Sequence, residues 1–439
     1  MKRLFVFLLA ALVLLSLAAC GVQTAPAPTP EQPSEQPVET PPVEDVTLDV
    51  VICRHGPDTE EWFLGSGMNG TSFVAKFEAE NPGVKLRLEV ISPDEAQHLV
   101  EERIAGGNAP DILNIADFYP FAADGLLMPV GDCCPDELYS DFFPAFLDES
   151  AIDGTVWALP CLASARAVFY NADLLEQAGV EIPATWAELE QVCQDILDYY
   201  DGDVLPWGVD MTADGIPQFF SCYAWGSGGG FVGEDGAWAL NSPENAEAVR
   251  FAVGLVDKGF TNPNPAIENA SALEELFAAG KLAMLTSDDR LPARVSDLGG
   301  SIRVAAACIP AAEGKVGSSE GEMDRLVVFR DDAAPDGAAR SEAIGKFLRF
   351  FYDPENYVDW AGMEGFLPAV RSASERFSPS DPFRGCWPEL MERCRFLPID
   401  KPGWDEVCAG LYSVVQLSLI GGDTQAALDA LQASVTTGS

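Results

Sequence analysis

Several charged and aromatic residues stand at or just beyond the carboxyl ends of strands that the sequence predicts. They are Arg54, His55 and Trp62 after the first strand, Asp117 and Tyr119 after another, and Asp288, Asp289 and Arg290 after a later one. In open α/β sheets, ligands bind at this edge of the sheet. Aromatic rings stack on the apolar face of a pyranose, and carboxylates accept hydrogen bonds from its hydroxyls. The residue types therefore favour a site for a sugar, with Trp62 expected to be exposed in a loop.

Most of these residues also have a structural explanation that the sequence leaves open. Asp117 could cap the helix that follows it. Asp288 and Asp289 occupy an expected turn, where Asp is common. Arg54 and Arg290 could form salt bridges with the abundant acids of the chain.

Other functions are open as well. Convergence of Arg54, Arg166 and Arg290 on one cleft would favour an anionic group, whereas carboxylates and aromatic rings alone would favour a sugar or a cation. Carboxylates that face each other across a cleft could hydrolyse a glycosidic bond. The sequence has no nucleophile elbow, HExxH motif or phosphate-binding loop, however, so we expect no enzyme. A structural or adhesive surface protein would bind no small ligand.

The sequence argues against a metal or cofactor. It contains two histidines, His55 and His98, and no CxxC pair, so we expect no zinc site and no cofactor. Ten of its eleven cysteines lie beyond residue 50. Cys386 and Cys394, with Cys408 nearby, could supply a disulfide in an oxidising compartment. They could equally be buried thiols in an organism that lives without oxygen.

The elements that would position the candidate residues alternate between short apolar strands and amphipathic helices. This order predicts an α/β fold whose strands are largely parallel. The expected strands are 47–54, 85–91, 111–116 and 282–285, and Thr185 to Glu188 has the capping-box pattern of a helix start. From residue 46 about 390 residues remain, which is more than one hydrophobic core usually serves, so we expect two lobes.

The first residues resemble the export signal of a bacterial lipoprotein. Met1-Lys2-Arg3 precedes a short apolar run, and Leu17-Ala18-Ala19-Cys20 resembles a lipobox. We expect residues 1–19 to be a cleaved signal peptide and Cys20 to carry a lipid that anchors the protein outside the cell membrane. Residues 20–45 are rich in proline and are expected to be a disordered tether. A chance cysteine in an ordinary signal peptide is the alternative, and the type of cell envelope stays open.

The charge of the chain is strongly acidic. Sixty-nine Asp and Glu face 26 Lys and Arg, for a net charge of −43, and −40 of this falls after residue 45. Such a surface repels nucleic acid, so we expect no nucleic-acid partner. It also keeps a tethered protein soluble.

Several segments, taken in order, resemble the family of extracellular solute-binding proteins related to maltose-binding protein. The segments are 77–85, 107–112, 125–129, 153–160, 169–175, 182–186, 277–284 and 365–368. The most telling of them is Phe169-Tyr170-Asn171-Ala172-Asp173-Leu174-Leu175. Together these segments span nearly the whole chain after the tether.

The resemblance implies a two-lobed α/β fold of the periplasmic-binding-protein type II, with a hinged cleft between the lobes. Lobe 1 would take residues 46–160 and 308–352, and lobe 2 residues 161–307 and 353–439. The resemblance adds ligand-binding candidates to those chosen above. They are the loop from Phe219 and Phe220 to Trp225, Phe366 near the last lobe contacts, and Trp404.

By this resemblance the protein would be the extracellular binding lipoprotein of an ABC importer. We expect a monomer that captures a mono- or oligosaccharide and delivers it to permease subunits in the membrane. A peptide, a polyamine or a phosphorylated polyol is the alternative cargo. Two departures from the family bear on the cargo: residues 318–324 replace a Gly-Gly near the cleft, and Arg54-His55-Gly56 lacks the family's aromatic cluster.

Overall fold

The structure is a computed structural model that describes residues 45–330, 337–377 and 385–437. The expected signal peptide, Cys20 and almost all of the tether lie outside the described residues. One sheet of nine strands organises the described chain. Its order is β2 (Val84–Ile91), β1 (Val46–Cys53), β3 (Ile112–Ile115), β10 (Ser319–Val328), β6 (Ala158–Asn171), β8 (Leu282–Asp288) and β7 (Leu205–Gly208), with β9 (Val304–Ala307) on β6 and β11 (Cys394–Arg395) on β10.

Helices surround this sheet, and a small hairpin of β4 (Ala151–Ile152) and β5 (Thr155–Val156) lies apart from it. The helices are α1 (Thr59–Leu64), α2 (Phe73–Glu80), α3 (Pro93–Ala105), α4 (Tyr119–Ala123), α5 (Asp136–Tyr139), α6 (Pro144–Asp148), α7 (Ala172–Ala178), α8 (Trp186–Tyr199), α9 (Ile216–Ser227), α10 (Pro243–Asp257), α11 (Ala270–Ala278), α12 (Leu291–Asp297), α13 (Gly337–Phe351), α14 (Pro354–Glu364), α15 (Arg371–Arg376), α16 (Trp387–Glu392), α17 (Trp404–Leu419) and α18 (Thr424–Thr437), with a 3₁₀ turn at Val130–Asp132.

The mixed α/β architecture agrees with the sequence, but the expectation of largely parallel strands is only partly right. β1 pairs in parallel with β2 and β3, and β7 pairs in parallel with β8. β6 and β10 run antiparallel to each other, β10 also to β3, and β6 also to β8 and β9. Their opposite direction arises because each joins two groups of elements instead of closing a strand-helix-strand unit.

The first group is built on both faces of β1. Val50 and Ile52 point into a core that includes Phe73 of α2 and Phe347 of α13. Val51, which points to the other face, belongs to a second core with α3. A strand buried on both faces has no polar alternation, and this explains the apolar run Val50–Cys53 at the end of β1.

Trp62 lies in the core of this first group, so the expectation of an exposed Trp62 is wrong. It belongs to helix α1 and is 3% exposed. Its ring centroid lies 5.4 Å from that of Phe73 and 6.4 Å from that of Trp360 in α14. The chain after residue 353 therefore returns to pack on the first helices.

The second group packs helices around β7 and β8. Its core includes Trp186 of α8, Trp207 of β7 and Tyr223 of α9, and the indole N–H of Trp207 donates to the Tyr223 hydroxyl at 2.8 Å. The expected loop at 219–225 is wrong, because these residues form the middle of α9 and are buried throughout. An all-round apolar helix of this kind is stable only inside a protein.

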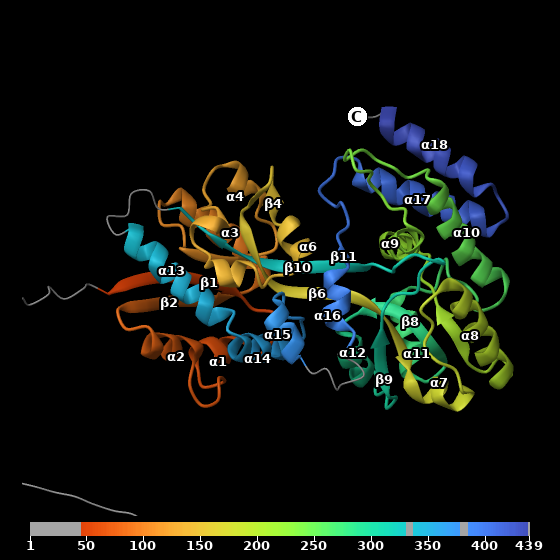
Figure 1. The fold of residues 1–439 in the computed structure, drawn as a ribbon, viewed down its shortest axis with the longest axis horizontal. Coiled ribbons are helices and arrows are strands. Elements are labelled where there is room, and N and C mark those ends of the chain that lie inside the picture. Colours follow the sequence, from red (N-terminus) through yellow and green to blue (C-terminus); the bar gives the residue numbers. More distant parts are fainter. Residues whose placement is uncertain (1–44, 331–336, 378–384, 438–439) are drawn as a thin grey trace, which may run out of the picture. The chain divides into compact units, whose positions relative to one another are not determined.

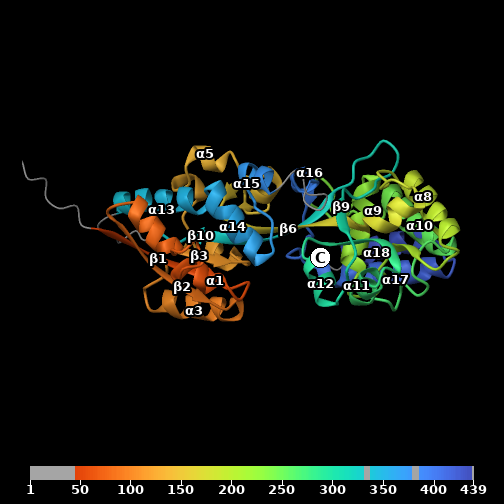
Figure 2. The same cartoon turned by 90° about the horizontal axis from the view of Figure 1, so that it is seen from below.

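Strands β6 and β10 connect the two groups (Figure 1, Figure 2). The first half of β6 pairs with β10, and Arg166 to Tyr170 pair with β8. The segment 318–324 that departs from the family pattern forms most of the first half of β10, with a register shift between Asp324 and Arg325. We refer to β6 and β10 as the crossing strands.

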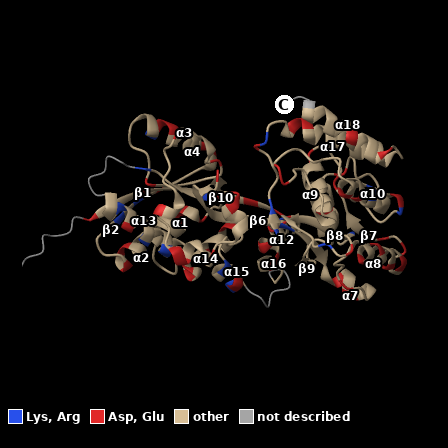
Figure 3. Cartoon of the chain, turned by 45° about the horizontal axis from the view of Figure 1, so that its top comes forward, with Lys and Arg blue, Asp and Glu red and all other residues tan. Residues whose placement is uncertain are grey.

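Acidic positions are spread over many helices, including α3, α8 and α18 (Figure 3). None of the helices in the described ranges is both long and apolar enough to cross a membrane.

Candidate functional site

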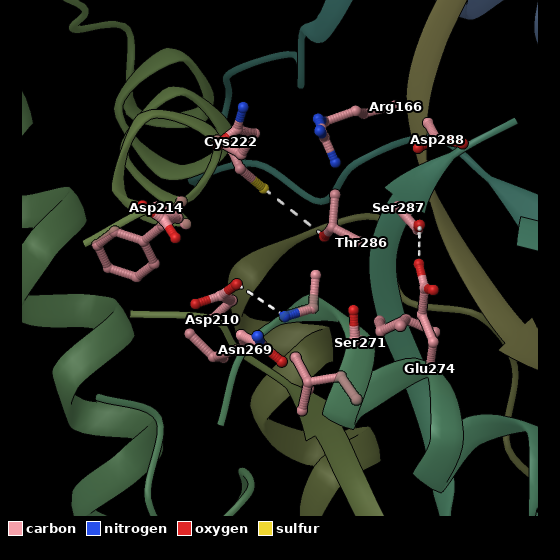
Figure 4. A pocket seen from close by; sticks show the side chains of 18 of the residues that line it. Arg166, Asp210, Asp214, Cys222, Asn269, Ser271, Glu274, Thr286, Ser287 and Asp288 are labelled. Carbon is pink, nitrogen blue, oxygen red and sulfur yellow. Dashed lines mark hydrogen bonds between the residues drawn. The ribbon is translucent and has the colours of Figure 1, made fainter. Parts of the chain in front are cut away.

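A cavity of about 460 Å³ opens at the carboxyl ends of β7 and β8 (Figure 4). We call it the β7–β8 cavity. The starts of α9 and α11 and the crossing strand β6 complete its walls. Its polar lining consists of Arg166, Asp210, Asp214, Gln218, Asn269, Ser271, Glu274, Thr286, Ser287, Asp288 and Arg294, and the rings of Phe219 and Tyr223 supply apolar surface.

A second cavity of about 420 Å³ lies beside the crossing strand β10, and we call it the β10 cavity. Residues 320–323 of the strand form one wall. The other lining residues are Ala116, Asp117, Tyr119, Glu149, Gln218, Arg325, Phe396, Leu397, Ile399 and Asp400. Gln218 lines both cavities, so the two adjoin at its side chain.

Two acids of the β7–β8 cavity share one arginine as their hydrogen-bond donor. Arg294 donates to both carboxylate oxygens of Glu274 and to both of Asp288, with contacts of 2.8 to 3.3 Å. Burial alone would raise the pKa of Asp288, but the hydrogen bonds and charge of Arg294 outweigh it and lower this pKa. Asp288, Glu274 and Arg294 therefore form a fixed wall.

The opposite wall has side chains with more freedom. Asp210 accepts hydrogen bonds from Thr212 and from the Ala270 N–H at the start of α11, at 2.7 to 2.9 Å. Asp214 is exposed and Gln218 half-buried, and within the described chain neither side chain has a hydrogen-bond partner. These groups can accept from or donate to a solute without breaking an existing bond.

Four of the predicted site residues line the cavities. Asp288 and Phe219 line the β7–β8 cavity, and Asp117 and Tyr119 line the β10 cavity. The ring of Tyr119 stacks on Phe118 at 4.7 Å, and burial raises the pKa of its hydroxyl. The Asp117 carboxylate also accepts from the Tyr119 N–H at 3.1 Å, so it serves the local turn while it faces the cavity.

Three other predicted residues meet outside both cavities. The Phe366 ring lies edge-on to the His55 imidazole, with 5.5 Å between the ring centroids. The Arg290 guanidinium carbon lies 5.5 Å from the centroid of the Phe366 ring. His55 Nε2 lies 2.7 Å from Asp324 Oδ2 and forms an ion pair with it when the imidazole is protonated. Burial lowers the pKa of His55, but the contact with Asp324 and the charges of Asp324 and Glu364 raise it overall.

Two further predicted residues, Asp289 and Arg54, line neither cavity. Asp289 is buried and accepts a hydrogen bond from the Ser164 hydroxyl, and burial raises the pKa of Asp289 to about 7. Arg54 is exposed, and its Nη2 lies 3.5 Å from Glu60 Oε2. This is a salt bridge with an acid of the chain, the structural alternative that the sequence offered for Arg54. The arginines at 54, 166 and 290 do not converge on one cavity, since of these three only Arg166 lines one.

The remaining predicted aromatic residues belong to hydrophobic cores. Phe220 and Trp225 pack on Phe231, with Trp225 also facing Arg395 at 4.9 Å. Trp404 packs on Phe231 and Trp238. Like Trp62, these three residues line neither cavity.

Sequence reasoning missed most of the polar lining of the β7–β8 cavity. β7 is four residues long and contains Pro206 and Gly208, so it carries no strand pattern. Had it been recognised, the rule of carboxyl ends would have selected Asp210, two residues after the strand. Arg166 was considered in the sequence only as one of three arginines that could converge, and its place in this cavity follows from the pairing of the crossing strands.

Neither a metal nor a disulfide is evident in the part of the chain that the structure covers. No three His, Cys, Asp or Glu side chains there are grouped so that they could hold a metal ion. The ten cysteines from Cys53 to Cys408 are free thiols, most of them buried.

The chain is similar in sequence to a family of known proteins. The model of the bacterial extracellular solute-binding protein family, which consists of binding proteins and not of enzymes, matches residues 70–358. A putative binding protein of Brucella abortus (strain 2308) is 28% identical over 357 residues, which cover 80% of this chain and 85% of that protein. A putative ABC transporter periplasmic-binding protein of Escherichia coli (strain K12) is 22% identical over 306 residues, 67% of each chain.

A solved structure confirms the periplasmic-binding-protein fold that the sequence predicts. The cyclic alpha-maltosyl-1,6-maltose binding protein from Arthrobacter globiformis superposes with a TM-score of 0.71 at 21% identity, over 90% of this chain and 98% of that chain. The fold and the family match agree over most of the described residues. The chain belongs to the bacterial extracellular solute-binding protein family.

Proposed function

We propose that this protein captures a carbohydrate for an ABC importer and delivers it to permease subunits in the membrane. The observation that carries the proposal is the lining of the β7–β8 cavity. Asp214, Gln218 and Asn269 offer hydrogen-bonding groups beside the rings of Phe219 and Tyr223. A sugar presents hydroxyls to the former and an apolar C–H face to the latter.

The relatives support this cargo and this role. The Arthrobacter globiformis protein is named for binding a cyclic maltosyl-maltose, and the Escherichia coli protein is described as part of an ABC transporter. The size of the cavity, about 460 Å³, suits one or two pyranose rings.

The crossing strands support a mechanism by hinge closure. In this proposal lobe 1 and lobe 2 are joined by β6 and β10, and closure brings the walls of the two adjoining cavities together around the solute. Because Trp360 lies against Trp62, we assign residues 354–377 to lobe 1 together with 46–160 and 308–352. Lobe 2 then takes 161–307 and the chain from residue 385.

The β10 cavity favours one alternative cargo. Five carboxylates line it, from Asp117, Glu149, Glu320, Glu322 and Asp400, against the single guanidinium of Arg325. This excess of negative charge would suit a cationic solute such as a polyamine. The negative charge disfavours a phosphorylated polyol. Arg54, Arg166 and Arg290 also do not line one common cavity, so they do not form an anion site together.

We also propose that Cys20 carries a lipid and that residues 20–45 tether the domain near the permease. The signal-like sequence supports this anchor. Metabolic labelling with a radioactive fatty acid tests it: label on the wild-type protein and none on Cys20→Ser is the expected result. Equal labelling of both would refute the anchor.

A thermal-shift panel tests the cargo. It contains glucose, galactose, maltose, cellobiose, mannitol, spermidine and a tripeptide. A solute at a hundred times its Kd should stabilise the protein by about 2.7 kcal/mol, a shift that is readily measured. We expect at least one neutral sugar to stabilise it. Stabilisation by spermidine alone would establish the alternative cargo, and no shift with any compound would contradict both.

A further inference from the structure

Arg166 and Glu320 form an ion pair between the two crossing strands. Arg166 Nε on β6 lies 3.5 Å from Glu320 Oε2 on β10. Arg166 lines the β7–β8 cavity and its side chain is 21% exposed, whereas the Glu320 side chain is 2% exposed. Arg166 therefore stands at the wall of the β7–β8 cavity (Figure 4), and Glu320 does not line that cavity.

The guanidinium of Arg166 has unused hydrogen-bonding capacity. It carries five N–H donors; the buried Nε faces Glu320 Oε2 at 3.5 Å, and the two terminal nitrogens donate no hydrogen bond to any described residue. Arg294 in the same cavity is the internal comparison, because it donates to Glu274, Ser287 and Asp288. The terminal N–H groups of this cavity-lining side chain are therefore free to donate to an acceptor on the solute.

The charge of Arg166, in contrast, is already neutralised. Glu320 is held in place by the Ser221 hydroxyl, which donates to the same carboxylate oxygen at 3.1 Å. The nearby acids Asp210 and Asp214 add negative charge to the cavity. An incoming carboxylate would compete with Glu320 and face this negative field, whereas a hydroxyl or ring oxygen would not.

We propose that Arg166 is a specificity-determining residue that donates hydrogen bonds to a neutral oxygen of the sugar, and that Glu320 makes the site discriminate against sugar acids. This proposal rests on the proposed function. It gives a role to the segment 318–324, which departs from the family pattern and supplies Glu320. The predicted selectivity is for a neutral sugar over the same sugar with a carboxylate.

Matched pairs of sugars test this selectivity by isothermal titration calorimetry. The probes are glucose, galactose, maltose and cellobiose, each compared with glucuronate, galacturonate, maltobionate and cellobionate respectively. The variants are Arg166→Met, which removes the donors at similar length, and Glu320→Gln, which removes the charge and still accepts from Ser221. Arg250→Met, on the exposed face of α10, is the control for the loss of an arginine.

Wild type should prefer the neutral member of the pair that it binds. Arg166→Met should weaken the neutral sugar by about tenfold or more, as expected for the loss of hydrogen bonds from a charged donor. It should weaken the acid further, because Glu320 is then uncompensated. Glu320→Gln should leave the neutral sugar within about threefold and strengthen the acid by about tenfold, since Arg166 gains a free charge.

Three results would overturn the inference while leaving the proposed function intact. They are a wild type that prefers the sugar acid, an Arg166→Met variant that binds the neutral sugar unchanged, and a folded Glu320→Gln variant with unchanged selectivity. Glu320→Gln could fail to fold, and Arg166→Met then tests the charge effect instead. Its preference for the neutral sugar over the sugar acid should be larger than that of wild type. Failure of every sugar to bind wild type would instead overturn the proposed function itself.

Discussion

The Ser164 hydroxyl donates a 2.5 Å hydrogen bond to Asp289 Oδ1, and this bond joins the crossing strand β6 to the turn after β8. Asp289 is 7% exposed. Burial raises the pKa of its carboxyl to about 7, although the hydrogen bond from Ser164 opposes the shift. The bond therefore places a carboxyl that titrates near neutrality beside the expected hinge.

Asp289→Asn should change how stability depends on pH. The folded protein keeps the Asp289 proton up to about pH 7, whereas the unfolded chain loses it near pH 3.8. This group therefore stabilises the fold at low pH, and its contribution falls by about 1.4 kcal/mol per unit as pH rises between these values. The asparagine mimics the protonated acid and does not titrate. The free energy of unfolding of Asp289→Asn should therefore rise relative to that of wild type between pH 4 and pH 7.

Urea unfolding at pH values from 4.5 to 8.5 measures this difference. We expect the variant's advantage in unfolding free energy to grow up to about pH 7 and then level off. The exposed Asp359→Asn is the matched control and should show no such trend. A difference between Asp289→Asn and wild type that is constant over the range would refute the assignment.

His55 should titrate above the ordinary histidine value. Asp324 and Glu364 favour its charged form more than burial disfavours it, so its pKa is raised above 6.5. The raised pKa stabilises the fold below pH 6.5, and this stabilisation is lost as pH rises through the folded value. Proton NMR can follow the ring signals directly, because the chain has only two histidines.

Asp324→Asn is the variant that isolates the cause. It should lower the pKa of His55 and leave the signals of His98 unchanged, and His55→Gln assigns the resonances. A His55 pKa that does not fall in Asp324→Asn would show that the ion pair is not its source.

Asn245→Ala should destabilise the second group of helices. The Asn245 amide donates to the carbonyls of Gly230, Ala239 and Leu240 at 2.8 to 3.0 Å and accepts from the Gly230 N–H at 2.8 Å. Truncation leaves these buried groups without partners, at a cost of about 2 to 4 kcal/mol. Chemical denaturation measures the loss, with Asn264→Ala as the control, and a loss below about 0.5 kcal/mol would contradict this role.

The ten cysteines beyond residue 50 should react with Ellman's reagent only slowly in the native protein. Burial raises the pKa of the Cys308 and Cys408 thiols to about 11, so few thiolates exist at pH 8. In guanidinium without reductant we expect all ten to react. A count lower by two would reveal a disulfide, the alternative that the spacing of Cys386 and Cys394 left open.

Local signals allowed much of the fold to be predicted. The expected strand 85–91 lies within β2, and Thr185 accepts from the Glu188 N–H at 3.2 Å while its own N–H donates to Glu188 at 3.0 Å. The crossing strand β10 could not be predicted, because its charged first half is held by its neighbours on both sides and not by an apolar pattern. Tertiary pairing overrides propensity there.

The candidate site was less accessible to sequence reasoning for a related reason. Asp117 and Asp288 follow strands with clear patterns, and both line a cavity. Trp62 and Trp225 were selected because aromatic rings suit sugars, but a large ring gains more from burial in a core than from exposure. Arg166 and Glu320 are far apart in sequence and meet only through the crossing strands.

The most direct test of the central claim is the affinity of the carbohydrate that gives the largest thermal shift, measured by calorimetry on wild type and on Asp214→Ala/Gln218→Ala. Both side chains face the β7–β8 cavity and neither has a hydrogen-bond partner in the described chain, so the double variant should fold normally. We predict one-to-one binding to wild type and an affinity at least about tenfold weaker in the variant. An unchanged affinity in the folded variant would contradict the account and place the sugar elsewhere.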